Sequence, residues 1–325
     1  MPHNMAAAYA DARAYCQLIA KVRPGAGILK TLLLRRIGSS LRAGLLTARK
    51  LRDGEEAALV GEEDEGLTRQ GVADVGGEAL AKLDIAIAKM EAAGDDDPKF
   101  RIVLNYLRHE GWADRGCILF SQYLDTVLWL AGHLARAFPQ ALVGIYGGQG
   151  NSYLLEGDRR RGAAREDIQA HVRDRSLRIL VATDAASEGL NLQRLETLIN
   201  VDLPWNPARL EQRKGRIDRI GQLAAAIDIL NLRYRGSVED EVHGALSSRL
   251  QQIRSIFGTI PDTLEDVWVA MALGEVEQAR RRISEVPSRH PFDLRYAQDL
   301  PETAWERCAE VLDHYDVLSV MKQPW

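Results

Sequence analysis

The sequence predicts an α/β fold, in which a parallel sheet is covered by helices and flanked by helical extensions. Three observations carry this prediction. From Lys99 onward, short apolar runs alternate with segments of helical periodicity, which is typical of a parallel sheet. Those apolar runs are rich in branched residues along their whole length, as expected for strands that are buried on both faces. The regions on either side show helical periodicity instead.

Local patterns place the elements of the sheet region. Strands are expected at Cys117–Phe120, Leu142–Tyr146, Ile179–Ala182, Leu198–Val201 and Ile227–Leu232. Helices are expected at Lys99–Glu110, from Tyr123, at Ala163–Arg173 and from Pro207. A proline in the first turn of a helix loses no hydrogen bond, which supports the last of these starts. The basic stretch with Arg159, Arg160 and Arg161 is expected to be a flexible solvated loop, and added charge for phosphate binding is the alternative.

The flanking regions differ in charge. Residues 6–52 and 78–93 have helical patterns, whereas residues 53–66 carry seven acidic side chains, three glycines and no basic residue. Such a segment is typical of an exposed acidic linker. Ser237 begins a helix-start signature that opens a C-terminal helical part. We therefore expect a helical N-terminal region with an acidic linker (1–98), the sheet region (99–236) and a helical C-terminal extension (237–325).

Composition limits the classes of function. The 325 residues carry a net charge of −4, so any nucleic-acid binding must use local basic patches. The three cysteines are far apart and form no CxxC pair, which argues against a disulfide framework or a zinc site and favours a reducing cytoplasm. The seven histidines show no HExxH spacing, so no metal centre is expected. No export signal and no membrane span is recognised.

The polar residues that follow two central strands form the strongest candidate site. Residues 183–189 follow the third predicted strand and residues 202–207 follow the fourth. Loops at the carboxyl ends of parallel strands are where open α/β sheets bind ligands. On the helix after Pro207, Gln212, Arg216 and Arg219 lie at i, i+4 and i+7, so they share one face. Their guanidinium groups suit phosphate oxygens, and a solvated basic face is the alternative.

Two long motifs in this stretch resemble those of a known family. Thr183–Gln193, Thr-Asp-Ala-Ala-Ser-Glu-Gly-Leu-Asn-Leu-Gln, resembles motif V of superfamily 2 helicases, and Gln212–Gln222 resembles motif VI. The intervening Asp-Leu-Pro-Trp-Asn-Pro (202–207) is similar to the SWI/SNF-type branch, and closest to its bacterial members. More weakly, Phe120–Tyr123 resembles motif IV, and Tyr146–Gly148 resembles the glycine turn that meets the nucleic-acid backbone.

The resemblance implies a RecA-like second motor lobe with defined roles for these residues. ATP with Mg²⁺ would lie between this lobe and a first lobe, and Arg216 and Arg219 would reach across the cleft as catalytic residues. The residues implied in nucleotide binding are Asp184, Glu188, Gly189 and Gln212. The residues implied in contacts with double-stranded DNA are Ser121, Gln122, Gly147, Gly148 and Thr183.

A first lobe would need a GxxxxGK[ST] P-loop and a DExx-type acidic box, and we identify neither before Lys99. We therefore expect the second half of a motor, inactive as an ATPase by itself, whose first lobe acts in trans or was lost by truncation. The alternative from another class is a non-catalytic module that keeps the fold as a platform for nucleic acid or protein. A Rossmann-type enzyme is disfavoured because no G-x-G-x-x-G follows a strand.

The C-terminal extension carries aromatic residues at helical spacing. They are Trp268, Tyr296, Trp305 and Tyr315, followed by a final Trp325. An aromatic side chain in a helical pattern usually belongs to a core, and we take that interpretation first. A docking surface for a protein partner is the alternative.

Overall fold

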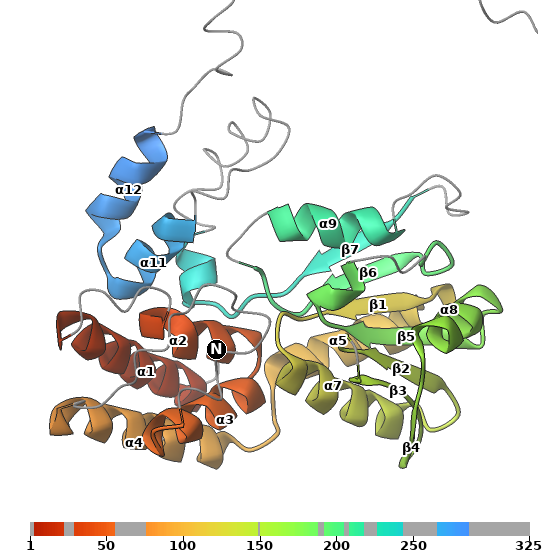
Figure 1. Ribbon diagram of the computed structural model, residues 1–325, viewed down its shortest axis with the longest axis horizontal. Helices are drawn as coiled ribbons and strands as arrows, with labels where there is room; N and C mark the ends of the chain where they lie inside the picture. The colour runs from red at the N-terminus through yellow and green to blue at the C-terminus, as the bar shows by residue number, and fades with distance from the viewer. Residues whose placement is uncertain are drawn as a thin grey trace, which may run out of the picture.

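The computed structural model describes residues 3–22, 29–55, 76–148, 150–187, 192–204, 208–217, 226–242 and 265–285. A sheet with helices on both faces forms one side of the molecule, and a group of helices forms the other (Figure 1). Within those ranges, no helix has the length and apolar character needed to cross a membrane.

The sheet has seven strands in the order β4-β3-β2-β5-β1-β6-β7. Its parallel strands are β1 (Cys117–Phe120), β2 (Leu142–Tyr146), β5 (Leu177–Ala182), β6 (Thr197–Asn200) and β7 (Asp228–Asn231). All five predicted strands are therefore confirmed, and their ends shift by two residues at most. The side chains of β1 and β6 are buried along the whole strand, as the branched apolar runs predict.

The two remaining strands correct one prediction. The expected flexible loop around Arg160 is instead an antiparallel hairpin of β3 (Ser152–Glu156) and β4 (Arg159–Gly162), paired to the edge of β2. Leu154 and Leu155 drive this outcome, because each buries its side chain in the core on a different face of the sheet. The strands are joined by Gly157 and Asp158, and Gly157 has a φ of 56°. A Gly-Asp pair between two strand-like runs is a hairpin signal.

Helices cover both faces of the sheet. On one face lie α5 (Pro98–His109), α6 (Trp112–Arg115) and α7 (Leu124–Ala137), which bury their apolar side chains in one core. On the other face, α8 (Arg165–Arg173) and α9 (Ala208–Ile217) contribute to a second core. A short 3-10 helix, η2 (Asp184–Ser187), follows β5. The predicted helices of this region are therefore confirmed.

The helical group unites both ends of the chain. It consists of α1 (His3–Val22), α2 (Leu29–Ser39), α3 (Leu41–Arg52), α4 (Gly77–Ala93), α11 (Glu265–Leu273) and α12 (Val276–Glu285). These helices share one core with Tyr234 and Val238, which follow the last strand. Trp268 is buried in that core, as predicted, whereas the four later aromatic residues lie outside the described ranges. The predicted domain boundaries stay predictions.

Candidate functional site

The carboxyl ends of three neighbouring strands bring several predicted site residues together. The main-chain N–H of Ser121, after β1, donates to Ala182 O at the end of β5 over 3.0 Å. The N–H of Thr183, after β5, donates to Tyr146 O at the end of β2 over 2.9 Å. The polar segments that follow β1, β2 and β5 are therefore contiguous, and they form one edge of the sheet.

Asp202 is the centre of this edge, although the sequence analysis gave it no role beyond its place in the 202–207 segment. It follows β6 and is only 5% exposed. Its carboxylate accepts hydrogen bonds from Ser39 Oγ (2.6 Å) and Ser121 Oγ (2.5 Å). It also accepts from the main-chain N–H of Gln122 (3.0 Å) and from Arg213 Nη2 (3.3 Å). One side chain thus joins β1, β6, α9 and the helical group.

Arg213 fixes helix α9 against the strand ends. Its side chain is 0% exposed. Nε donates to Asp184 Oδ1 at 2.5 Å. Nη1 donates to Asn200 Oδ1 at 3.1 Å and to the main-chain oxygen of Asp202 at 2.9 Å. Burial alone lowers the pKa of Arg213, but the carboxylates of Asp184 and Asp202 outweigh it and raise that pKa above its ordinary value.

Arg213 also sets the rotation of α9. Arg213 and Ile217 lie at i and i+4, and both are completely buried, so they mark the face of α9 that packs on the protein. On the neighbouring face Gln212 is exposed and Arg216 is partly buried. Arg219 lies outside the described residues, so the predicted face that it shares with Gln212 and Arg216 stays a prediction.

The predicted motif V residues are only partly described. Asp184 begins η2, and besides Arg213 it lies 3.6 Å from Arg209 of α9. Motif V and α9 are therefore joined by ion pairs to one carboxylate. Glu188 and Gly189 lie outside the described residues. Their predicted contacts with nucleotide are not tested.

The residues predicted to contact nucleic acid serve structural roles at this edge. Ser121 is 0% exposed, and its Oγ accepts a hydrogen bond from the main-chain N–H of Tyr123 at the start of α7. Thr183 is 1% exposed, and its Oγ1 accepts from the N–H of Ala185. The N–H of Gln122 donates to Asp202. These groups are occupied within the protein, so their contact with phosphate stays a prediction.

The glycine turn after β2 has a steric explanation. A Cβ on Gly147 would lie 2.6 Å from a methyl carbon of Leu124 and 2.9 Å from Asn151 O. Gly148 has a φ of 90°, which an L side chain rarely adopts. The N–H of Gly147 donates to Asn151 O at 2.9 Å. Both glycines are therefore required by the turn itself, whatever it binds.

A second buried junction attaches the helical group to the same edge. Lys99 is buried, and its Nζ donates to Gly38 O (2.6 Å), Val201 O (2.5 Å) and Ser39 O (3.4 Å). Nζ also lies 4.3 Å from the centre of the Tyr234 ring. Burial lowers the pKa of Lys99 below its ordinary value. Lys99 therefore connects the last residues of α2 to the end of β6.

Asp97 completes this junction from the other side of Lys99. Its carboxylate accepts from the N–H groups of Lys99 (2.9 Å) and Leu41 (3.2 Å), which are the early residues of α5 and α3. It also accepts from Tyr234 Oη at 2.6 Å. One carboxylate thus accepts hydrogen bonds at the starts of two helices, α5 beside the sheet and α3 in the helical group. Capping a helix start is a common role for aspartate.

Fold and site together define a RecA-like lobe, a mostly parallel sheet between helices with its polar segments at the carboxyl ends of the strands. Residues 99–221 match the family model of the helicase conserved C-terminal domain. The described part of the candidate site lies mainly inside this match. Ser39 lies outside it, and so do the residues of the second junction other than Lys99 and Val201, namely Gly38, Leu41, Asp97 and Tyr234.

Among curated relatives, the chain is similar to the uncharacterized ATP-dependent helicase YqhH of Bacillus subtilis (strain 168), with 33% identity over 156 residues, or 48% of this chain and 26% of the relative. It is also similar to the RNA polymerase-associated protein RapA of Vibrio atlanticus, with 35% identity over 114 residues, or 33% of this chain and 11% of the relative. The mitochondrial DEAD-box ATP-dependent RNA helicase 9 of Arabidopsis thaliana is 28% identical over 183 residues, or 56% of this chain and 28% of the relative.

The alignments thus cover less than a third of the length of each of these relatives. Among solved structures, the C-terminal part of the Fun30 ATPase domain is similar with a TM-score of 0.46 and 14% identity, and the match covers 85% of this chain and 96% of that one.

Proposed function

We propose that this chain is the second motor lobe of an ATP-dependent double-stranded-DNA translocase of the SWI/SNF type. The observation that carries the proposal is the anchoring of α9 by Arg213, which fixes the arginine helix beside the motif V segment at the ligand-binding edge of the sheet. The resemblance of residues 202–213 to the SWI/SNF-type branch supports the choice of duplex DNA. A reducing cytoplasm is the proposed compartment, because the three cysteines are scattered.

In this proposal the work of ATP hydrolysis is divided between two lobes. The 325 residues contain no GxxxxGK[ST] sequence, so a lobe with a P-loop must grip the phosphates and Mg²⁺. Arg216 and Arg219 supply positive charge to the transferring phosphoryl group from the opposite side. Such an arginine is worth on the order of 10³–10⁵ in rate. The backbone at Gly189 approaches the nucleotide closely, because glycine has no Cβ.

Arg213 and Asp184 act in this scheme by positioning. Because Arg213 is buried and paired to carboxylates on two strand ends, α9 cannot rotate or shift without leaving buried charges unpaired. Arg216 lies on the adjacent face, so its place relative to the cleft is fixed before nucleotide arrives. Preorganised charge is what electrostatic catalysis requires.

The proposal is tested by measuring ATP hydrolysis with duplex DNA present. We expect no hydrolysis by the chain alone, and hydrolysis when a P-loop lobe is added or joined to it. Arg216→Ala should abolish that activity, whereas Arg178→Ala, an exposed arginine near the amino end of β5, should not. Robust hydrolysis by the chain alone, or full activity of Arg216→Ala in the two-lobe protein, would contradict the proposal.

The second candidate is a non-catalytic platform that retains this fold. The observation that favours it is that Arg213, Asp202 and Lys99 use their polar groups in buried bonds within the protein, which is a structural role. A platform predicts that Arg216→Ala binds duplex DNA or protein as the unaltered chain does, and that no added P-loop lobe produces hydrolysis.

A further inference from the structure

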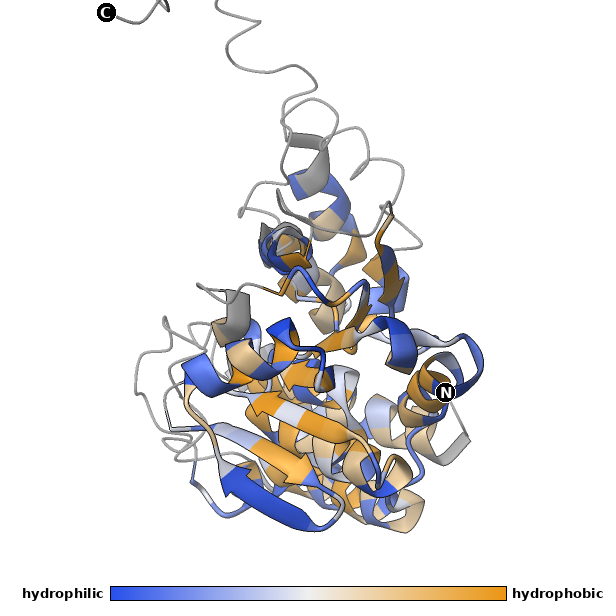
Figure 2. Ribbon diagram, turned by 90° about the vertical axis from the view of Figure 1, so that its right-hand side faces the viewer, coloured by the Kyte–Doolittle hydropathy of each residue, from blue (hydrophilic) through white to orange (hydrophobic). Residues whose placement is uncertain are grey.

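The β3–β4 hairpin carries three consecutive arginines on the outermost strand of the sheet. Arg159, Arg160 and Arg161 of β4 are all exposed, and in Figure 2 their strand is the blue, hydrophilic one beside the orange strands. β4 pairs only with β3, so its other edge faces outward. Within the described part of the chain, no ion pair joins any of the three to a carboxylate. Their charge is therefore available to a partner.

The register places these charges on both faces of the hairpin. Arg161 lies opposite Leu154, and Arg160 lies opposite Leu155. Leu154 packs on the α8 side of the sheet and Leu155 on the α7 side, so the arginines alternate in the same way. Consistent with this, Arg161 Nη2 lies 3.3 Å from Nε2 of His171 on α8. The edge thus presents positive charge in two directions.

Arg160 is held in place before any partner arrives. Its guanidinium carbon lies 3.5 Å from the centre of the Tyr153 ring, a cation–π contact that orders the side chain. Tyr153 Oη in turn donates to Gly150 O at 3.2 Å. Gly150 lies two residues beyond Tyr146–Gly148, the segment that resembles a nucleic-acid-binding turn, so Arg160 is connected to the chain next to that turn. Ser152 Oγ also donates to Gly148 O, which ties the start of β3 to that turn.

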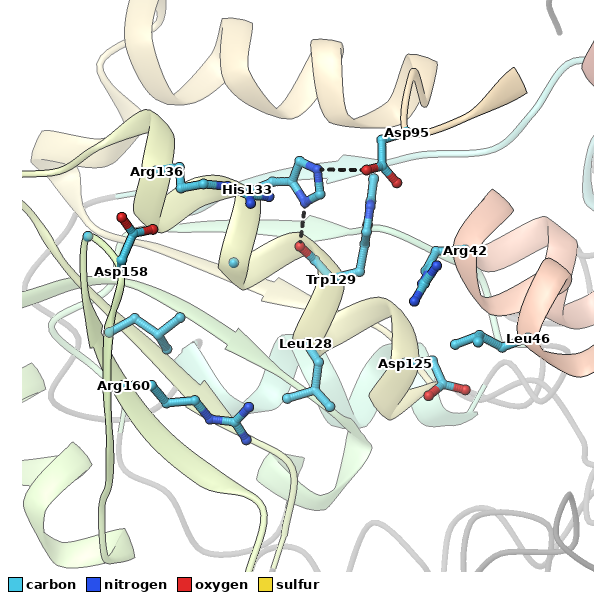
Figure 3. A pocket seen from close by; sticks show the side chains of 13 residues that line it. Arg42, Leu46, Asp95, Asp125, Leu128, Trp129, His133, Arg136, Asp158 and Arg160 are labelled. Carbon is cyan, nitrogen blue, oxygen red and sulfur yellow. Dashed lines mark hydrogen bonds and ion pairs between the residues drawn. The ribbon is translucent and has the colours of Figure 1, made fainter. Parts of the chain in front are cut away.

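The nearby pocket is a poorer anion site than the exposed edge. Arg160 points into a pocket of about 570 Å³ between the hairpin, α7 and α3, together with Arg42 and Arg136 (Figure 3). Three aspartates line the same pocket: Asp95, Asp125 and Asp158. Their negative charge balances the arginines, so the pocket favours no anion. On the hairpin itself, three arginines face two carboxylates, Glu156 opposite Arg159 and Asp158 before it, so the edge keeps a net positive charge.

We propose that the β3–β4 hairpin binds the phosphate backbone of duplex DNA through Arg159, Arg160 and Arg161. The proposal rests on the proposed function and adds a contact surface to it. The Ser121 hydroxyl, the Gln122 main-chain N–H and the Thr183 hydroxyl bond within the protein, and none of these groups is cationic, so positive charge for phosphate must come from other residues. Guanidinium groups bind phosphate oxygens by paired hydrogen bonds and carry no sequence preference in doing so.

Two further properties of the edge favour a polyanion over an added β-strand. Charged side chains on a short edge strand discourage pairing with another strand, and β4 has four residues, three of them arginine. Side chains alternate along a strand, so Arg159 and Arg161 lie on the same face of β4, about 6.6 Å apart, and can contact two phosphates there, while Arg160 faces the other way.

The experiment compares the salt dependence of duplex DNA binding in two triple variants of the full chain. The test variant is Arg159→Gln, Arg160→Gln and Arg161→Gln, and binding of a fluorescent duplex is measured by anisotropy between about 50 and 200 mM salt, a range over which phosphate contacts change affinity strongly. The control replaces three exposed arginines elsewhere with glutamine, namely Arg49, Arg52 and Arg101. Both variants lose the same net charge.

We expect the slope of log affinity against log salt to become shallower by about 0.9 for each lost contact in the test variant, and to change little in the control. Equal slopes in the unaltered chain and the test variant would overturn the hairpin contact while leaving the proposed function in place. Failure of the unaltered chain to bind duplex DNA, alone and with a P-loop lobe, would overturn both. A shallower slope with duplex RNA only would also contradict a DNA contact.

Discussion

The molecule uses arginine in two opposite ways at the two sides of its sheet. On the β6 side, Arg213 is completely buried and its guanidinium group bonds to Asp184, Asn200 and Asp202. On the β4 side, three arginines are exposed and have no carboxylate partner among the described residues. The side chain is the same in both places. Burial and pairing decide whether its charge organises the fold or remains free for a ligand.

The energetic consequences differ in the same way. Breaking a buried pair by removing one partner costs about 3–5 kcal/mol, because an uncompensated charge remains inside the protein. An exposed charge contributes about 0–1 kcal/mol. The comparison therefore predicts which substitutions act on folding and which act on binding alone.

The largest effect is expected from Asp202→Ala. This change leaves Arg213 with one carboxylate and removes the acceptor of Ser39, Ser121 and the Gln122 N–H. The free energy of unfolding, measured by urea denaturation, should fall by about 3–5 kcal/mol. The matched control is Asp228→Ala, because Asp228 is 53% exposed and pairs with Arg115 on the surface. A loss below about 1 kcal/mol for Asp202→Ala would show that the buried network does not hold the site together.

The next largest loss of stability is expected from Arg213→Lys. This change keeps the positive charge but replaces the planar guanidinium group, with its several N–H donors, by a single ammonium group. A single ammonium group cannot donate to Asp184, Asn200 and Asp202 from one position as the guanidinium group does. We expect a loss of about 1.5–3 kcal/mol, the value of a hydrogen bond to a charged group. Arg209→Lys is the control, because Arg209 is 40% exposed and its contact with Asp184 is 3.6 Å long. Equal losses in the free energy of unfolding for the two variants would contradict a special role for the Arg213 guanidinium group.

A pH titration sharpens the account of burial in the sheet core. Burial raises the pKa of the Cys117 thiol from 9.0 to about 12. Between these pH values the folded state keeps a proton that the unfolded state has lost, so the free energy of unfolding falls as pH rises. One such group contributes up to about 1.4 kcal/mol per pH unit. Cys117→Ala should make the decline shallower by that amount, and an unchanged slope would mean that the thiol is accessible to solvent.

The smallest effect on stability is expected from the Arg159, Arg160 and Arg161 triple glutamine variant. Arg160 lies over the ring of Tyr153, a contact worth about 0.5–1 kcal/mol at an exposed site, and Arg161 makes one exposed hydrogen bond to His171. The double variant Arg159→Gln and Arg161→Gln, which keeps Arg160, should be about as stable as the unaltered chain in the same denaturation experiment. A loss as large as that of Asp202→Ala would show that the edge is part of the fold instead of a free surface.

Sequence patterns predicted the parallel strands because apolar periodicity is strong wherever a strand is buried on both faces. They missed the hairpin because the basic run of β4 has no apolar member, although Gly157 and Asp158 carried a turn signal. Arg213 and Lys99 were missed for a related reason. Charged residues are usually exposed, and only their partners, which are distant in sequence, make burial favourable.

The turn before α5 shows the same limit. Asp97 lies in the polar run Asp95-Asp96-Asp97-Pro98, yet it is buried and bonds to Leu41 and Tyr234. A capping aspartate and an exposed turn have the same local sequence. Only the tertiary contacts distinguish them.

The measurement that tests the central claim most directly is ATP hydrolysis by the two-lobe protein with and without Arg216→Ala. The account predicts that the variant folds and binds duplex DNA as the unaltered protein does. Its rate of ATP hydrolysis should fall by a factor of at least about 10³. An Arg216→Ala protein that hydrolyses ATP at the unaltered rate would contradict the claim that this lobe completes a nucleotide site.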